Sequence, residues 1–139
     1  MSTPAGYSGA PLPAKLGIRP ESVVALAGAP PGFRDRLGDL PGAELLDGLP
    51  PSGELLDVIV FFTTSRAEYE AELGTLREHM APACGLWIAF PKRAAKVPTD
   101  MTDHVVREVA LPTGLVDNKV CAIDQVWTGI RLVIRRELR

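Results

Sequence analysis

Small, hydroxyl-bearing and basic residues follow three apolar runs of the sequence, and together they could bind an anion. The residues are Gly28, Gly32, Thr63, Thr64, Ser65 and Lys92. Glycine lets a backbone approach a ligand closely, the N–H groups behind a capping serine favour an anion, and lysine adds positive charge. The sequence therefore predicts a crevice for a small anion. In the alternative, the glycines only form a tight turn, Ser65 only caps a helix, and Lys92 is only solvated.

A second candidate site lies near the C-terminus. Asp124 stands where a strand is expected to end and Trp127 follows in a turn, with Asp117 and Lys119 upstream. An aspartate near a tryptophan and a lysine could bind a ligand or take part in proton transfer. The alternative is structural: Asp124 caps the turn, Trp127 covers the edge of a sheet, and Asp117 and Lys119 form a surface ion pair.

A third candidate is the basic cluster at the end of the chain. It consists of Arg131, Arg135, Arg136 and Arg139. Arginines on a strand could contact phosphates, but no exposed aromatic residues alternate with them as in single-strand nucleic-acid binders. We expect instead that they keep an edge strand from pairing with other chains.

Cysteine and histidine positions predict neither a metal site nor a catalytic triad. Cys84 and Cys121 lie beside or inside apolar runs and form no CxxC motif, so we expect two buried, reduced thiols. We place His79 on the polar side of one helix and His104 in the first turn of another. Asp100 and Asp103 fit the positive end of that second helix better than a catalytic carboxylate pair.

Composition and charge are those of an ordinary soluble protein. The chain has 139 residues, 46% hydrophobic and 23% charged, with 15 basic and 17 acidic residues and a net charge of -2. This balance does not favour nucleic acid or an anionic membrane as a partner. The apolar runs are too short to span a bilayer and the N-terminus does not resemble a signal peptide, so we expect a cytoplasmic protein.

Apolar runs and turn residues predict the strands. Residues 23–27 are expected to form the first strand and residues 43–46 a short strand. Residues 55–62 and 85–90 are expected to be buried strands, with helices over both faces of the sheet. Two further strands are expected over 115–124 and 129–136, joined by a turn near Trp127-Thr128-Gly129, the second being half-buried.

Helical spacing and capping residues predict the helices. Leu12 to Leu16 should form one turn. A second helix should start at Pro30 or Pro31 and run through Phe33, Leu37 and Leu40 to Pro41. Ser65 and Glu68 form a capping box for a third, whose stripe Tyr69, Leu73, Leu76 and Met80 is closed by Pro82. Thr99 or Thr102 should cap a fourth, with Met101, Val105 and Val109 facing inward.

This order of elements predicts the fold class. Strands that alternate with helices and end in a strand pair indicate an open Rossmann-like α/β sheet, mostly parallel, with a C-terminal antiparallel pair and helices on both faces. We expect one domain over residues 12–139 and a flexible N-terminal arm over residues 1–11.

Three segments resemble a bacterial family that is known only as domain of unknown function (DUF) 3052. The segments are YSGAPLPAKLGIRP, GLWIAFPKRAAKVPTD and REVALPTGLVDNKVCAIDQVWTGIRLVIRR. The resemblance covers nearly the whole chain and implies a compact cytoplasmic α/β protein without an assigned reaction. The family usually has tryptophan where this chain has Phe90.

The segment KLGIRPESVVALAGAPPGF is similar to the first motif of S-adenosylmethionine-dependent methyltransferases. This resemblance implies a cofactor loop at 27–32 and an acidic residue, here Asp47, that binds the ribose at the end of the second strand. The loop departs from the family's G-x-G-x-G pattern through Pro30 and Pro31, which lack backbone donors.

Three classes of function stay open. The first is a non-catalytic module that binds a small anionic ligand or a protein partner, including a second copy of itself. The second is a small enzyme or degenerate methyltransferase that uses the crevice, and the third is a nucleic-acid accessory protein. We predict no resident cofactor or metal, and no membrane partner.

Overall fold

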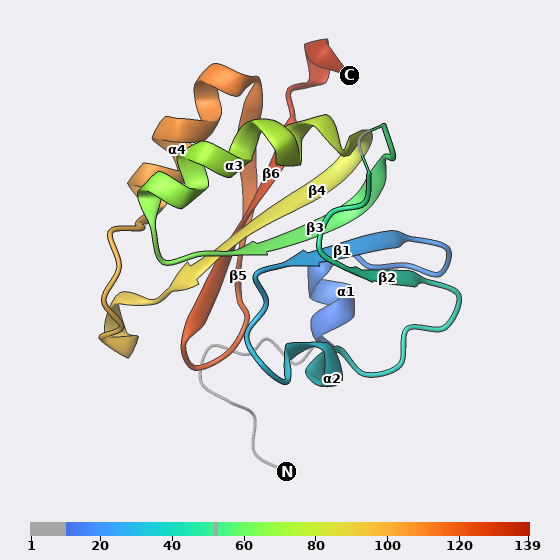
Figure 1. Cartoon of the computed structure of the whole chain (residues 1–139), viewed down its shortest axis with the longest axis horizontal. Coiled ribbons are helices and arrows are strands. Elements are labelled where there is room, and N and C mark those ends of the chain that lie inside the picture. The colour runs from blue at the N-terminus through green and yellow to red at the C-terminus, as the bar shows by residue number, and fades with distance from the viewer. Residues whose placement is uncertain (1–10, 52) are drawn as a thin grey trace.

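The computed structural model describes residues 11–51 and 53–139, which form a six-stranded sheet (Figure 1). The strands are β1 (Val23–Ala27), β2 (Glu44–Asp47), β3 (Leu56–Phe62), β4 (Met80–Pro91), β5 (Leu115–Ala122) and β6 (Trp127–Ile134). Their spatial order is β2-β1-β3-β4-β6-β5. The first four strands are parallel, and β6 runs antiparallel to both β4 and β5. The predicted open, mostly parallel Rossmann-like sheet with a C-terminal antiparallel pair is therefore confirmed.

Helices cover both faces of the sheet. Figure 1 shows α3 (Arg66–Glu78) and α4 (Asp103–Ala110) on one face, with α1 (Leu12–Leu16) and α2 (Phe33–Leu37) on the other. Three short 3-10 turns complete the described elements: η1 (Arg93–Ala95), η2 (Leu111–Thr113) and η3 (Arg136–Leu138). Residues 1–10 of the predicted N-terminal arm lie outside the described residues.

The face under α3 and α4 carries the larger apolar cluster. Successive strand residues point to opposite faces, so Ile59 and Phe61 of β3 face these helices while Val58, Val60 and Phe62 face α1 and α2. Burial on both sides explains why residues 58–62 of β3 are continuously apolar. Tyr69 anchors α3 to α4, because its hydroxyl donates to the Val106 carbonyl oxygen at 2.8 Å.

The opposite face has less helical cover. Leu16 of α1 and Phe33 and Leu37 of α2 are buried against β3 and Trp87 of β4. The Trp87 indole N–H donates to the Leu16 carbonyl oxygen at 3.0 Å, so α1 is held by a buried hydrogen bond as well as by apolar packing.

The second helix is shorter than predicted. It begins at Phe33 after Gly32, not at Pro30 or Pro31, and it ends at Gly38, where φ is +73°, before the predicted stop at Pro41. Leu40 therefore packs from the loop that follows the helix. The short strand is shifted by one residue from the prediction, to Glu44–Asp47.

The third helix ends two residues before Met80, which is the first residue of β4 and pairs with Leu56. Pro82 lies in the irregular stretch between this pair and the Val58–Gly85 pair, where a missing N–H interrupts no ladder. His79 does not lie on a polar helix face as predicted. It is buried, and its Nδ1 lies 2.7 Å from the Glu54 carbonyl oxygen.

The last helix is capped by Thr102, whose Oγ1 accepts the Val105 N–H at 3.1 Å. Its buried residues are Val105, Val106 and Ala110, and Val109 is partly buried and packs against the same core cluster, so its inward position is as predicted. Met101 is buried but precedes the helix.

The C-terminal strand pair also differs from the prediction in its turn. Residues 123–126 form the turn, and Trp127 already belongs to β6 and pairs with Pro91. Because β6 lies between β4 and β5, Arg131 does not protect an edge strand. Its side chain instead lies over Gly85 of β4, where a Cβ atom would collide with the Arg131 Nε.

Candidate functional site

The C-terminal ends of β1 to β4 meet at one edge of the sheet, where ligands bind in open α/β folds. Because β6 is antiparallel to β4, its start reaches the same edge, and the Lys92 N–H donates to the Val126 carbonyl oxygen at 2.7 Å. The crevice residues and the Asp124–Trp127 pair, predicted as two separate sites, therefore lie along one edge. We call it the carboxyl edge.

Two glycines shape the loop after β1. Gly28 has a φ of +70°, and a Cβ atom there would lie 2.8 Å from the Phe62 carbonyl oxygen. Gly32 has a φ of +83° with open space around it and precedes the first residue of α2. Glycine is thus required at position 28 by close approach and at position 32 by backbone conformation alone. Among the described residues, the N–H groups of Ala29 and Gly32 have no hydrogen-bond partner.

Asp47 is the last residue of β2 and lies beside the end of β1, opposite Leu26. Its carboxylate is 2.8 Å from Arg34 Nη1, and its side chain is 75% exposed. An ion pair this exposed contributes little free energy, so the Asp47 carboxylate is available to a ligand at small cost.

The N-terminus of α3 is occupied by groups of the chain itself. Ser65 Oγ accepts the Glu68 N–H at 3.1 Å, which confirms the predicted cap. Asp100 Oδ1 accepts the Arg66 N–H at 2.7 Å, so this carboxylate lies at the start of α3 and not, as predicted, at the positive end of α4. An internal carboxylate thus lies where the predicted crevice would hold an anion.

The two threonines before Ser65 also bond within the chain. Thr63 is buried, and its Oγ1 accepts the Ser65 N–H at 3.0 Å. The Thr64 carbonyl oxygen accepts from Thr99 Oγ1 at 2.7 Å. The Thr99 contact joins the loop after β3 to the segment before α4.

Asp124 joins the last turn to α2. Its Oδ1 accepts the N–H groups of Val126 at 2.8 Å and Trp127 at 2.7 Å, and its Oδ2 lies 2.6 Å from Arg36 Nη2. Burial by itself raises the pKa of Asp124, but the two N–H donors and the guanidinium outweigh it and hold that pKa below its ordinary value. Asp124 therefore has the turn-capping contacts that the structural alternative describes.

An aromatic row lines the same edge on the α2 side. The rings of Phe33 and Phe62 lie edge to face at 4.8 Å between centroids, and Phe62 and Trp127 do so at 5.2 Å. The Arg36 guanidinium carbon lies 5.4 Å from the centre of the Phe33 ring. Trp127 thus packs into a cluster rather than projecting alone toward a ligand.

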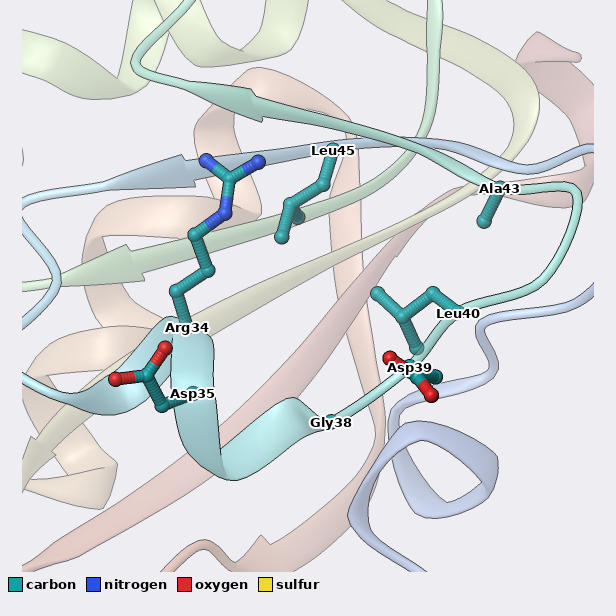
Figure 2. A pocket seen from close by; sticks show the side chains of 7 residues that line it. All are labelled: Arg34, Asp35, Gly38, Asp39, Leu40, Ala43 and Leu45. Carbon is teal, nitrogen blue, oxygen red and sulfur yellow. The ribbon is translucent and has the colours of Figure 1, made fainter.

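A pocket of about 410 Å³ opens between α2 and β2 (Figure 2). Arg34 reaches from α2 toward the strand, Leu45 projects from β2, and Asp39 and Leu40 lie on the connecting loop. This pocket lies beside the Arg34–Asp47 ion pair and is lined mainly by polar surface. Lys92 lies elsewhere, in a pocket between the end of β4 and the start of α4.

The thiols and metal-ligating side chains form no further site in the part of the chain that the structure describes. Burial, helped by the negative charge of Asp57, raises the pKa of Cys84 to about 12. Burial also raises the pKa of Cys121. Both cysteines are free and buried, as predicted. Within residues 11–51 and 53–139 no three His, Cys, Asp or Glu side chains converge as a metal site would require, and no helix is long and apolar enough to cross a membrane.

Known structures share this architecture. A SAM-dependent methyltransferase from Aquifex aeolicus matches with a TM-score of 0.64 and 15% identity over 87% of each chain. The fibrillarin pre-rRNA processing protein of Methanococcus jannaschii matches at 0.61 and 13% identity, over 85% of this chain and 68% of its own. Aeropyrum pernix fibrillarin, solved with natively bound S-adenosyl-L-methionine, matches at 0.59 and 11% identity, over 92% and 70%.

The chain therefore has the Rossmann-like fold of S-adenosylmethionine-dependent methyltransferases. No model of a protein family and no curated protein matches the sequence, so the resemblance to DUF3052 stays a prediction.

Sequence reasoning missed two residues at this edge. The sequence gives no sign of a partner for Arg36, and the position of Asp100 predicts an interaction with α4 rather than with α3. Both bind groups that are distant in sequence, and no spacing rule signals such contacts.

Proposed function

We propose that this chain is a methyltransferase-like protein that binds S-adenosylmethionine at the carboxyl edge, between the loop at 28–32 and Asp47. The observation that carries this proposal is the position of Asp47: an exposed carboxylate at the end of β2, next to the glycine loop that follows β1. In the resembling enzymes, an acidic residue at this place binds the ribose hydroxyls.

The loop supplies the complementary donors. The unpaired N–H groups of Ala29 and Gly32 could receive the carboxylate of the ligand's methionine part. Pro30 and Pro31 contribute none, so we expect weaker binding than a full glycine-rich loop would provide. A relevant precedent is the Aeropyrum pernix protein, which shares the fold and was solved with natively bound S-adenosyl-L-methionine.

The test is calorimetric titration of the full chain with S-adenosylmethionine and S-adenosylhomocysteine. Asp47→Asn should lower the affinity at least tenfold. Glu44→Gln is the matched control, since Glu44 is an exposed carboxylate at the other end of the same strand. No binding at millimolar ligand, tighter binding of ATP, or equal losses in the two variants would contradict the proposal.

A second candidate is binding without methyl transfer, which is the first class that the sequence left open. It is favoured by the thin cover over β2: this strand is an edge of the sheet, and the described residues between β2 and β3, 48–51 and 53–55, form no helix. Less of the chain is available to exclude water from a bound substrate. A chain that binds the ligand but forms no S-adenosylhomocysteine with a broad panel of nucleophiles would support this candidate.

A further inference from the structure

A second pocket, of about 660 Å³, lies between the end of β4 and the start of α4. Its lining includes Phe90, Val97 and Met101, of which Val97 is half-buried and the other two are buried, together with Thr99 and Thr102. Its outer rim carries Lys92, Arg93 and His104. Its volume lies in the range of small-molecule sites, and an apolar interior with a few charged groups is their usual composition.

Internal bonds hold the segment that closes this pocket. Thr99 Oγ1 donates to the Thr64 carbonyl oxygen at 2.7 Å and accepts the Met101 N–H at 3.0 Å. Asp100 next to it accepts the Arg66 N–H at 2.7 Å. The pocket is therefore built between fixed elements, and a ligand would find its walls in place.

The cations on the rim lack the partners that other arginines of this chain have. Arg34, Arg36, Arg66, Arg107 and Arg135 each lie within 4.0 Å of a carboxylate. Within the described ranges, neither Lys92 nor Arg93 has an ion pair or a side-chain hydrogen bond. Asp103 is the single carboxylate among the described lining residues, so the rim keeps an excess of positive charge.

We propose that this pocket binds a small organic carboxylate. Its apolar body packs against Val97 and the small exposed parts of Phe90 and Met101, and its carboxylate lies between Lys92 and Arg93. The planar guanidinium of Arg93 can donate to both oxygens of a carboxylate, and the ammonium of Lys92 adds a positive charge whose position is less restricted. The apolar lining residues favour such a ligand over a bare inorganic anion, which would bury none of their exposed surface. This site needs no methyl donor and does not depend on the proposed function.

Benzoate is the probe for the test, with benzamide and inorganic phosphate as comparison ligands, in calorimetric titrations of the full chain. Benzoate should bind saturably and at least tenfold more tightly than either. The double variant Lys92→Ala/Arg93→Ala should lose at least tenfold in benzoate affinity. Arg135→Ala/Arg136→Ala removes the same charge from an exposed site and should bind benzoate as the parent chain does. Circular dichroism of both variants checks that they are folded.

Four results would overturn the proposal. Absence of saturable benzoate binding would exclude the site, and equal binding of benzamide would exclude a role for the cations. Equal binding of phosphate would exclude a role for the apolar lining residues. Equal losses of benzoate affinity in the two double variants would show that the overall charge of the chain, and not this pocket, determines the affinity.

Discussion

The two faces of the sheet are stabilised in different ways. On one face, α3 has 13 residues and a capped N-terminus, and together with α4 it covers a large apolar cluster. On the other face, α1 and α2 have five residues each, and neither has a side-chain cap. Instead α2 is joined to its surroundings by the Arg34–Asp47 and Arg36–Asp124 ion pairs.

This difference separates the part of the molecule that makes the fold stable from the part that can adapt to a ligand. Helices shorter than about 12 residues are marginal by themselves, so α2 depends on Phe33, Leu37 and its ion pairs. The candidate ligand residues Gly28, Gly32 and Asp47 all lie at this thinner end. We expect the truncation of a buried apolar side chain to lower the free energy of unfolding more on the α3 side than on the α2 side.

The largest effect is expected from the apolar cores. Leu73→Ala in α3 should lower the free energy of unfolding by about 3 kcal/mol, and Leu37→Ala in α2 by about 2 kcal/mol, because a short surface helix can move into the gap. Both side chains are almost fully buried. Urea denaturation measures the two values. An equal or larger loss for Leu37→Ala would contradict the comparison.

The next largest effect is expected where the loop after β1 approaches the backbone of β3. Gly28→Ala should cost about 2 kcal/mol or more, because a positive φ is combined with a Cβ contact to the Phe62 carbonyl oxygen. Gly32→Ala has a similar φ but open space, and should cost only about 1 kcal/mol. Thermal unfolding of the two variants decides whether close approach or backbone conformation matters more.

The Asp124–Arg36 contact should show a pH dependence. Asp124→Asn should destabilise the protein by about 1.5 kcal/mol at pH 7, because a charged acceptor is lost. The folded-state pKa of Asp124 is lowered, so its carboxylate contributes fully above about pH 4, the unfolded value, and this contribution is lost as the pH falls through the folded-state value. Denaturation at pH 7 and pH 3 should show a smaller difference between variant and parent at the lower pH; a constant difference would contradict the prediction.

A smaller effect is expected at the α3 cap. Ser65→Ala removes the bond to the Glu68 N–H and should cost about 1 kcal/mol. Hydrogen exchange should then increase in the first turn of α3 and leave the amides of α4 unchanged. A uniform increase over both helices would show that the cap acts through the whole domain.

The smallest effect is expected from Arg34→Ala. Its ion pair with Asp47 is exposed on both sides, so the loss should stay under about 0.5 kcal/mol. If Asp47 binds a ribose, freeing its carboxylate should leave the affinity for S-adenosylmethionine unchanged or higher. If Arg34→Ala lowered the free energy of unfolding as much as Asp124→Asn does, the two ion pairs of α2 would contribute equally to stability, which would contradict the prediction.

Much of the fold could be predicted because its strands are buried on both faces and bounded by turn residues. The first strand was placed at its observed bounds, 23–27, and Ser65 was recognised as a cap. Helical periodicity failed where the next element continued it: Met80 fits the stripe of α3 but belongs to β4. The same periodicity extended α2 through Leu40, since apolar spacing does not register the positive φ of Gly38.

The crevice at the carboxyl edge could be predicted as a unit, because the ends of parallel strands meet at one edge of a sheet. That Asp124 and Trp127 reach the same edge follows from the antiparallel placement of β6 directly next to β4, which local sequence does not encode. The contact of Asp100 with the Arg66 N–H, which occupies the predicted anion position, joins residues 34 apart.

The hydrogen bond between the Trp87 indole and Leu16 has a practical consequence. Trp87 is wholly buried under α1, whereas Trp127, the second tryptophan of the chain, is partly exposed. Release of α1 would expose the Trp87 indole to water and shift its fluorescence emission to the red while the sheet stays folded. In a Trp127→Phe background, this protein carries an intrinsic optical reporter for the docking of its first helix.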